Sequence, residues 1–301
     1  MRYGAIALKG DVRSTTETLG RTFPTAIADI KCTLHSPVLS GAGSDTSSEN
    51  VMSPFANLWP DINWWGHYSA GSSEVAIKTF GVSVDDNCPL TTLRDISEGI
   101  QAWENRLVGW LSVLADGPME LIGDHHAEVS WEDLVASEES GRMYFGSSRT
   151  VSLPKVVTAD QWVYALLQTG SNVDAPLYRV LLVEAERAIA SSRWRSAVVD
   201  AAAATEVAIS KALSQELSQW NPAPATEAIL KRVRMLGPMV SFAREVGLVI
   251  PERIQADLID MRNRVMHQGF PAGKEEAVEV CRLAREVIDG LLPFSQVGSC
   301  P

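Results

Sequence analysis

Arg262 and His267 stand five residues apart near the end of the chain, and Asn263 directly follows the arginine. An arginine keeps its charge and binds phosphate oxygens with a fixed fork of donors, whereas a histidine takes and gives protons near neutral pH. These two groups are the minimum set for cleaving a phosphodiester without a metal ion. The pattern therefore predicts phosphate chemistry at Arg262, Asn263 and His267.

The sequence places these residues on a helix. Pro251 suits the first turn of that helix, and Gly269 is a natural stop. Apolar residues recur between them at helical spacing: Ile254, Leu258, Met261 and Val265. Five residues along an α-helix turn about 140° and rise about 7.5 Å. Arg262 and His267 therefore do not stack on one stripe, whereas Asn263 and His267, four residues apart, share a side.

A purely structural interpretation stays open beside the chemical one. Cationic side chains near a helix C-terminus favour the helix dipole and cap free carbonyl groups. Arg262 would then pair with an acidic residue such as Glu252 or Asp257, or with another helix. Arg264 is interpreted as a solvated neighbour of the pair, with contact to an RNA backbone as the alternative.

The chain from Ala175 onward is patterned as a series of helices. Leu177, Leu181, Ala185, Ala188 and Ile189 form one expected stripe. Further helices are expected over 194–219, 226–236, 239–246, 251–269 and 274–292, separated by short connections and by the Asn221–Pro224 break. Short connections between amphipathic helices predict an antiparallel bundle.

The first part of the chain shows mixed signals that predict an α+β domain. Branched and aromatic residues indicate strands over 3–9, 25–34, 75–80 and 143–153. One amphipathic helix is expected around Ile96–Leu114. The run from Ser36 to Ser53, rich in Ser, Gly, Asp and Asn, is expected to form a loop.

The net charge of −11 is unevenly distributed. Residues 1–174 carry 11 Lys and Arg against 22 Asp and Glu, whereas residues 175–301 carry 15 of each. An acidic surface repels polyanions, so the first part is a poor nucleic-acid surface and the second is permissive. We expect two domains: residues 1–174, an acidic α+β domain with a sensory or regulatory role, and residues 175–301, a helical bundle.

Other residue types narrow the class of protein. The four cysteines are scattered without a Cys-x-x-Cys pair, and no apolar run is long enough for a membrane span. These features predict a cytoplasmic protein without a metal site. His125 and His126 are adjacent and lack a third spaced ligand, so a surface turn is favoured there. The aromatic segment 64–68 is expected to belong to the core rather than to stack on a base.

The C-terminal region, about residues 176–293, resembles the HEPN family of nucleotide-binding helical bundles. The family motif is an arginine followed after four to six residues by a histidine, often with a polar residue after the arginine; Arg262, Asn263 and His267 match its four-residue form. A second likeness lies upstream. Ala185-x-x-Ala188, the segment from Arg193 to Ala201 and Thr205-Glu206 resemble the early helices of bacterial members, in which an alanine-rich helix carries a glutamate.

The resemblance implies a metal-independent endoribonuclease that needs no cofactor, acts on RNA as a homodimer and leaves a 2′,3′-cyclic phosphate. It implies further that His267 moves the proton and that Arg262 holds phosphate charge. Glu206 either orients this pair or is an ordinary glutamate on the helix surface, and both interpretations stay open. Toxins and antiviral effectors of this kind suggest a defence role, with the N-terminal domain binding a regulatory partner. Members silenced by nucleotide transfer carry a tyrosine where this chain has Gly269, so that control is not expected.

A rival interpretation belongs to another class of protein. The bundle would be a non-catalytic dimerisation or nucleic-acid-binding module, and the N-terminal domain would carry the function. A small-molecule enzyme in the N-terminal domain is a third possibility, for which the sequence shows no motif.

Overall fold

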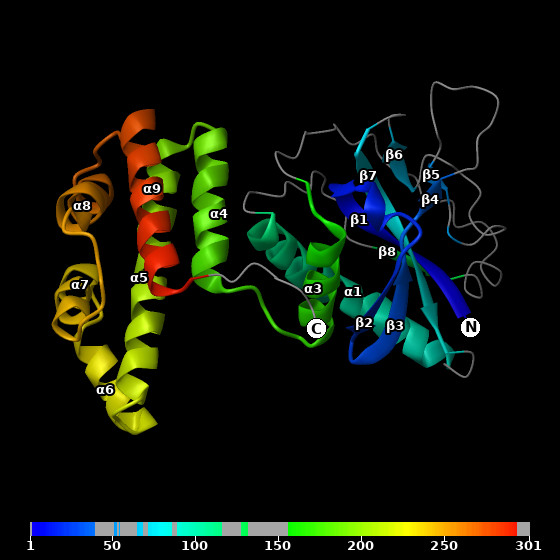
Figure 1. Ribbon diagram of the computed structural model, residues 1–301, viewed down its shortest axis with the longest axis horizontal. Coiled ribbons are helices and arrows are strands. Elements are labelled where there is room, and N and C mark those ends of the chain that lie inside the picture. Colours follow the sequence, from blue (N-terminus) through cyan, green and yellow to red (C-terminus); the bar gives the residue numbers. More distant parts are fainter. Residues whose placement is uncertain are drawn as a thin grey trace. The chain divides into compact units, whose positions relative to one another are not determined.

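The computed structural model describes residues 2–39, 51–52, 54, 65–68, 72–85, 89–115, 128–131 and 156–293. The chain divides into two compact units, Met1–Asp174 and Ala175–Pro301 (Figure 1). The first contains an antiparallel sheet and the second is helical. The expectation of an α+β part followed by a helical bundle is thus confirmed at this level of description.

Unit 1 is built on a sheet with the strand order β2-β3-β7-β1-β8, and β6 also pairs with β7. Each of these strand pairs is antiparallel. Their bounds are β1 Arg2–Thr15, β2 Thr22–Ile27, β3 Ile30–His35, β6 Gly66–Tyr68, β7 Glu74–Val84 and β8 Glu128–Trp131.

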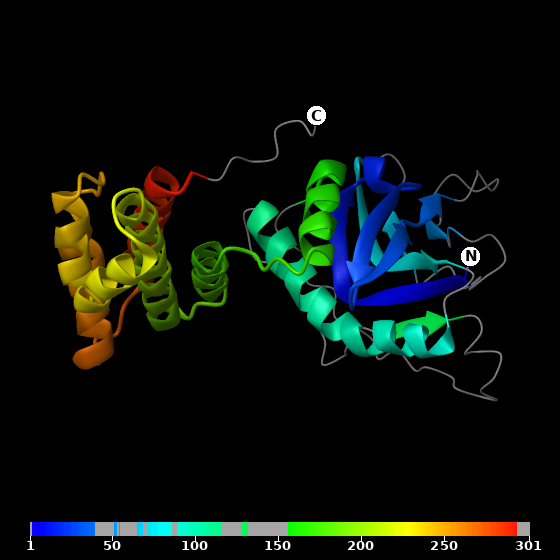
Figure 2. The same ribbon diagram turned by 90° about the horizontal axis from the view of Figure 1, so that it is seen from below.

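Two helices, α1 (Leu90–Leu114) and α3 (Ala159–Gly170), pack against this sheet (Figure 2). Each anchors a buried indole to a strand hydroxyl. Trp103 Nε1 donates to Thr25 Oγ1 at 3.3 Å, and Trp162 Nε1 donates to Ser14 Oγ at 3.1 Å. The helix expected around Ile96–Leu114 is therefore present and begins earlier.

Two expectations for unit 1 need correction. The segment 25–34 is not one strand, because Ala28 and Asp29 both adopt positive φ and turn β2 into β3 as a two-residue hairpin. The expected loop 36–53 contains a short pair of strands, β4 (Val38–Leu39) with β5 (Val51–Met52). The strand expected over 143–153 and the pair His125-His126 lie outside the described residues. Trp65 is fully buried, as an aromatic core predicts.

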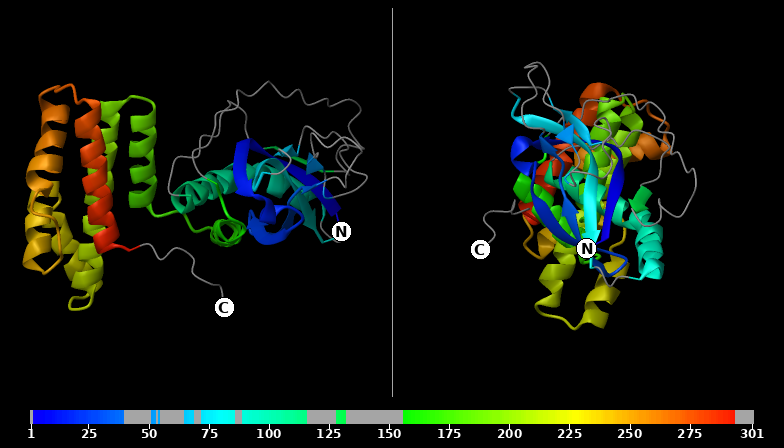
Figure 3. Two further views of the ribbon diagram at one scale, coloured as in Figure 1. Left: turned by 45° about the horizontal axis from the view of Figure 1, so that its top comes forward. Right: turned by 90° about the vertical axis from the view of Figure 1, so that its right-hand side faces the viewer.

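Unit 2 is a helical bundle around the long helix α5 (Trp194–Ser218). Alanines along α5 are buried and allow close approach of its neighbours, α4 and α9 (Figure 3). The other elements are α4 Leu177–Ala190, α6 Ala223–Arg232, α7 Leu236–Glu245, the π-helical turn η3 Gln255–Asp260, α8 Met261–His267 and α9 Lys274–Leu291. None of the helices in the described ranges is long and apolar enough to cross a membrane.

A buried arginine joins α4 to α9. Arg179 donates through Nη1 to Asp289 Oδ1 at 2.5 Å and through Nη2 to the Leu292 carbonyl at 3.0 Å. Most of the stripe expected on α4 is confirmed, because Ala185 and Ala188 are buried and Leu181 and Ile189 pack against the core. Leu177 is the exception at 57% exposed, and Tyr178 and Leu182 add to the buried face. The helix expected over 226–236 ends at Arg232, and Leu236 begins the next one.

Candidate functional site

Arg262, Asn263 and His267 all lie on α8, directly after the π-helical turn. The helix expected from Pro251 to Gly269 is therefore not one regular α-helix. Gln255 Nε2 donates to Asp260 Oδ1 at 2.9 Å, a contact between residues five apart that suits the wider π-helical turn. Single π-helical turns occur often at functional sites. Ile254, Leu258 and Val265 are buried, so the apolar stripe holds this segment against the bundle.

Arg262 is half-buried and its guanidinium Nη1 donates to Asn263 Oδ1 at 3.1 Å. In the part of the chain that the structure describes, no carboxylate pairs with Arg262. The structural alternative, in which Glu252 or Asp257 neutralises it, is not what the geometry shows. Asn263 thus orients the guanidinium without cancelling its charge, and the charge remains available to an anion.

The surrounding arginines are in a different situation. Arg253 is paired with Glu279 at 2.9 Å and with Glu286. Arg282 also pairs with Glu279, at 2.5 Å, and this hydrogen bond lowers the pKa of the Glu279 carboxyl. This network links the turn before α8 to α9, and its glutamates neutralise the charges of Arg253 and Arg282. Arg262 differs from these neighbours in lacking an acidic partner among the described residues.

Arg264 is held by the end of its own helix. Its guanidinium carbon lies 3.7 Å from the centre of the Phe270 ring, and its carbonyl accepts hydrogen bonds from the backbone N–H groups of Gln268 and Phe270. Gly269, at φ 65°, permits this turn of the chain. The stacking assigns Arg264 a structural part in closing α8, although its side chain stays exposed.

His267 is exposed and lies in the last turn of α8. No hydrogen bond or ion pair engages its ring within the described ranges, so the imidazole is free to meet a ligand. Because five helical residues separate it from Arg262, the two side chains leave α8 in directions about 140° apart. One copy of α8 therefore does not close a site around one phosphate by itself.

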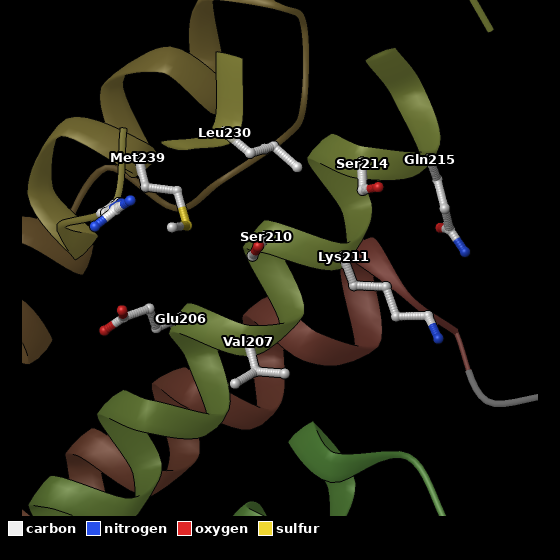
Figure 4. A pocket seen from close by; sticks show the side chains of 9 residues that line it. Glu206, Val207, Ser210, Lys211, Ser214, Gln215, Leu230 and Met239 are labelled. Carbon is white, nitrogen blue, oxygen red and sulfur yellow. The ribbon is translucent and has the colours of Figure 1, made fainter. Parts of the chain in front are cut away.

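Glu206 lies elsewhere in the bundle. Its half-buried side chain lines a groove of about 750 Å³ between α5, α6 and α7, and no hydrogen bond or ion pair joins it to Arg262 or His267 among the residues described. The groove is shown in Figure 4. Its lining residues are Glu206, Val207, Ser210, Lys211, Ser214, Gln215, Leu230, Arg234 and Met239. The structure thus shows no polar interaction, among the described residues, through which Glu206 would support the pair as expected.

The groove was not anticipated from the sequence, although a signal for it exists. Glu206, Ser210 and Ser214 recur every four residues and form a polar row on a helix that is otherwise rich in alanine. A buried helix should be apolar all round, so such a row indicates a face without a packed neighbour.

Other chemistries find little support in the described residues. No group of three or more His, Cys, Asp or Glu side chains there is placed to hold a metal ion. Cys281 is buried, and burial raises the pKa of its thiol to about 12, which keeps it protonated and unreactive at neutral pH. The buried Cys281 is thus no candidate nucleophile.

No protein-family model, curated protein or solved structure matches this chain.

Proposed function

We propose that this protein is a metal-independent endoribonuclease of the HEPN type that acts as a homodimer. The observation that carries the proposal is the state of α8: a half-buried arginine without a carboxylate partner in the described structure, oriented by Asn263, on the same short helix as an exposed histidine. Arg253, which links the turn before α8 to α9, is by contrast paired with glutamates.

The chemistry follows from these three side chains. His267 takes the proton of a ribose 2′-hydroxyl, whose oxygen attacks the neighbouring phosphorus. The bond from phosphorus to the 5′-oxygen breaks, and that oxygen receives a proton from a second imidazole. Arg262 stabilises the charge that gathers on the phosphoryl oxygens. The products are a 2′,3′-cyclic phosphate and a 5′-hydroxyl, and proton transfer of this kind contributes about 10²–10⁴ in rate.

A second copy of the chain completes this site. Since Arg262 and His267 diverge along α8, a two-fold axis beside α8 brings the arginine of one subunit toward the histidine of the other. The second histidine also supplies the acid that the reaction requires. The acidic N-terminal unit would keep RNA away until a regulatory partner binds, which fits a toxin or antiviral effector.

The decisive experiment compares the wild type with Arg262→Ala and His267→Ala on a labelled RNA, in the presence of a chelator. We expect wild-type cleavage with a cyclic phosphate end, and a loss of about 10²–10⁴ in rate for His267→Ala. A single 2′-deoxy substitution at the cleaved position should block the reaction. Gln268→Ala, an exposed neighbour, serves as the control and should cleave normally. Cleavage that persists in both variants, or stops with the chelator, contradicts the proposal.

Mixing the two inactive variants tests the shared site. Heterodimers of Arg262→Ala and His267→Ala retain one arginine and one histidine, which act from different subunits, but lack the second imidazole. With water as the acid, the mixture should recover a small part of the wild-type activity, above that of either variant alone. No recovery, with subunit exchange shown by mass spectrometry, would exclude an arginine and histidine that act from different subunits.

The rival proposal is a non-catalytic HEPN-like module for dimerisation or nucleic-acid binding. It predicts RNA binding or dimers without cleavage, and no change of phenotype in either variant. His267 favours the enzyme over this rival, because its ring is exposed and makes no hydrogen bond or ion pair within the described ranges.

A further inference from the structure

The groove between α5, α6 and α7 presents hydrogen-bonding groups that the bundle does not use. Two other hydroxyls of α5 donate back to their own helix: Thr205 to the Ala201 carbonyl at 2.9 Å, and Ser218 to the Gln215 carbonyl at 2.9 Å. Ser210 and Ser214 make no such bond in the described structure. Both hydroxyls line the groove and are half-buried, so a ligand or water must satisfy them.

Two cations flank these hydroxyls. Lys211 and Arg234 are exposed, line the groove and have no carboxylate within ion-pair distance among the described residues. Arg232, also exposed, lies nearby on α6 but does not line the groove. Elsewhere in the bundle, Arg253 and Arg285 are both paired with glutamates. The positive charge at the groove is therefore available to an anionic ligand.

The lining favours a nucleic-acid strand over a helical peptide. A peptide helix docks through a continuous row of apolar anchors, and here the row along α5 is Glu206, Ser210 and Ser214. Apolar side chains complete the lining, namely Val207, Leu230 and Met239, and none of them belongs to this row. Hydroxyl groups with lysine and arginine are the usual partners of phosphate and sugar oxygens.

We propose that this groove binds the single-stranded RNA substrate at a distance from the cleaved bond. In Figure 4, Lys211 and Gln215 project from one side of α5, Glu206 and Met239 lie on the other, and Ser210 and Ser214 lie between. A strand that crosses α5 over the two serines meets Lys211 with one phosphate and Arg234 with another. Glu206 then accepts a hydrogen bond from a ribose hydroxyl, and Leu230 and Met239 contact the sugar or base.

The groove and α8 belong to the same layer of the bundle. The elements α6, α7 and α8 follow one another along the side of α5 that faces away from α4 (Figure 1, Figure 2). An RNA strand held at the groove therefore reaches α8 by passing α7. This inference rests on the proposed function, since it gives the substrate of Arg262 and His267 a second point of attachment.

The test measures how RNA affinity depends on salt, with the full-length protein carrying His267→Ala to prevent cleavage. Each phosphate contact on a single strand contributes about 0.7 to the slope of log K against log salt. We expect Lys211→Gln and Arg234→Gln to reduce the slope by about 0.7 each, and the double variant by about 1.4. Arg232→Gln is the matched control, because it removes the same charge from a neighbouring position outside the groove and should leave the slope unchanged.

Cleavage assays separate this inference from the proposed function. In the otherwise wild-type protein, the double variant should raise KM for a long RNA and leave the cleavage of a dinucleotide unchanged. If slope and KM stay at wild-type values while Arg262 and His267 remain essential, the groove inference is wrong and the nuclease stands. If Arg232→Gln reduces the slope as much as Arg234→Gln, general charge and not the groove binds the RNA. If the wild type cleaves no RNA, the proposed function is wrong, and the salt slopes alone decide whether the groove binds RNA.

Discussion

At the scale of single residues, what distinguishes a candidate catalytic group is what surrounds it. Arg253, Arg262 and Arg264 are close in sequence, yet one is paired with glutamates, one is oriented by an asparagine and one is stacked on an aromatic ring. Of these three, Arg262 alone keeps its charge uncompensated and partly shielded from water. The electrostatic attraction between an arginine and an anion depends on both conditions, because nearby carboxylates cancel the field of the guanidinium and water screens it.

Asp200 provides a pH-dependent test at this scale. Burial raises the pKa of its carboxyl, the negative charge of Glu184 raises it further, and Arg193 opposes them. A folded pKa above the unfolded value means that the native state is favoured while the carboxyl is protonated, and that this stability is lost as pH rises through the folded pKa. Asp200→Asn should therefore stabilise the protein at pH 7, by about 0.2–1 kcal/mol for a partly exposed charge.

This gain should vanish near pH 3, where the carboxyl is protonated in both states. Urea unfolding at the two pH values measures it. Glu252→Gln removes the same charge from an exposed position and should change little. An equal gain at both pH values would show that charge is not the cause.

At the scale of elements, the end of α8 controls how His267 is presented. Gly269 has φ 65° and open space where the side-chain carbon of another residue would lie, so an alanine there would suffer from backbone strain alone. Left-handed conformation costs an ordinary residue about 1–2 kcal/mol. We expect Gly269→Ala to destabilise unit 2 by about 1 kcal/mol, measured by urea unfolding followed by circular dichroism.

Gly237 is the matched control for this substitution. It lies in α7, also with open space around it, but without a positive φ. Gly237→Ala should stabilise by about 0.4–1 kcal/mol, because alanine has less freedom to lose on folding. If the two substitutions had effects of the same sign, the turn at Gly269 would not be under the constraint inferred here.

At the scale of the whole molecule, the two units differ in net charge. Unit 1 carries the entire net charge of −11, and the helical unit carries none. A fragment of residues 175–301 should therefore bind RNA more tightly than the full chain at low salt, since the repulsive field of unit 1 is gone. The difference should disappear near 1 M salt, where the Debye length is about 3 Å. Fluorescence anisotropy with one labelled RNA measures both proteins.

The fragment retains the buried core that runs from Tyr178 to Leu292, so it should fold cooperatively. Circular dichroism supplies that control. Equal affinity of fragment and full chain at low salt would show that unit 1 does not restrain the RNA surface by charge. In cells, the fragment should then be no more toxic than the full chain.

The sequence alone determined the positions of most helices in unit 2. Apolar residues recur there every three to four positions, and breaks such as Asn221–Pro224 end a helix for local reasons. The same local rules put Arg262, Asn263 and His267 on one helix that ends at Gly269. Local rules were weaker in unit 1. The hairpin turn at Ala28 and Asp29 lacks the Asn-Gly or Asp-Gly pair that marks such turns, so the strand 25–34 was predicted without its bend.

Only the tertiary structure decided which polar side chains have partners. Whether Arg262 is neutralised depends on which carboxylates the packing brings near it, and the α9 carboxylates Glu279 and Glu286 pair with Arg253 and Arg282 instead. Glu206 lines the groove beside α6 and α7 because of how these helices pack on α5. Periodicity along one helix identifies a polar row, but the neighbour that this row faces is set by contacts between helices far apart in the chain.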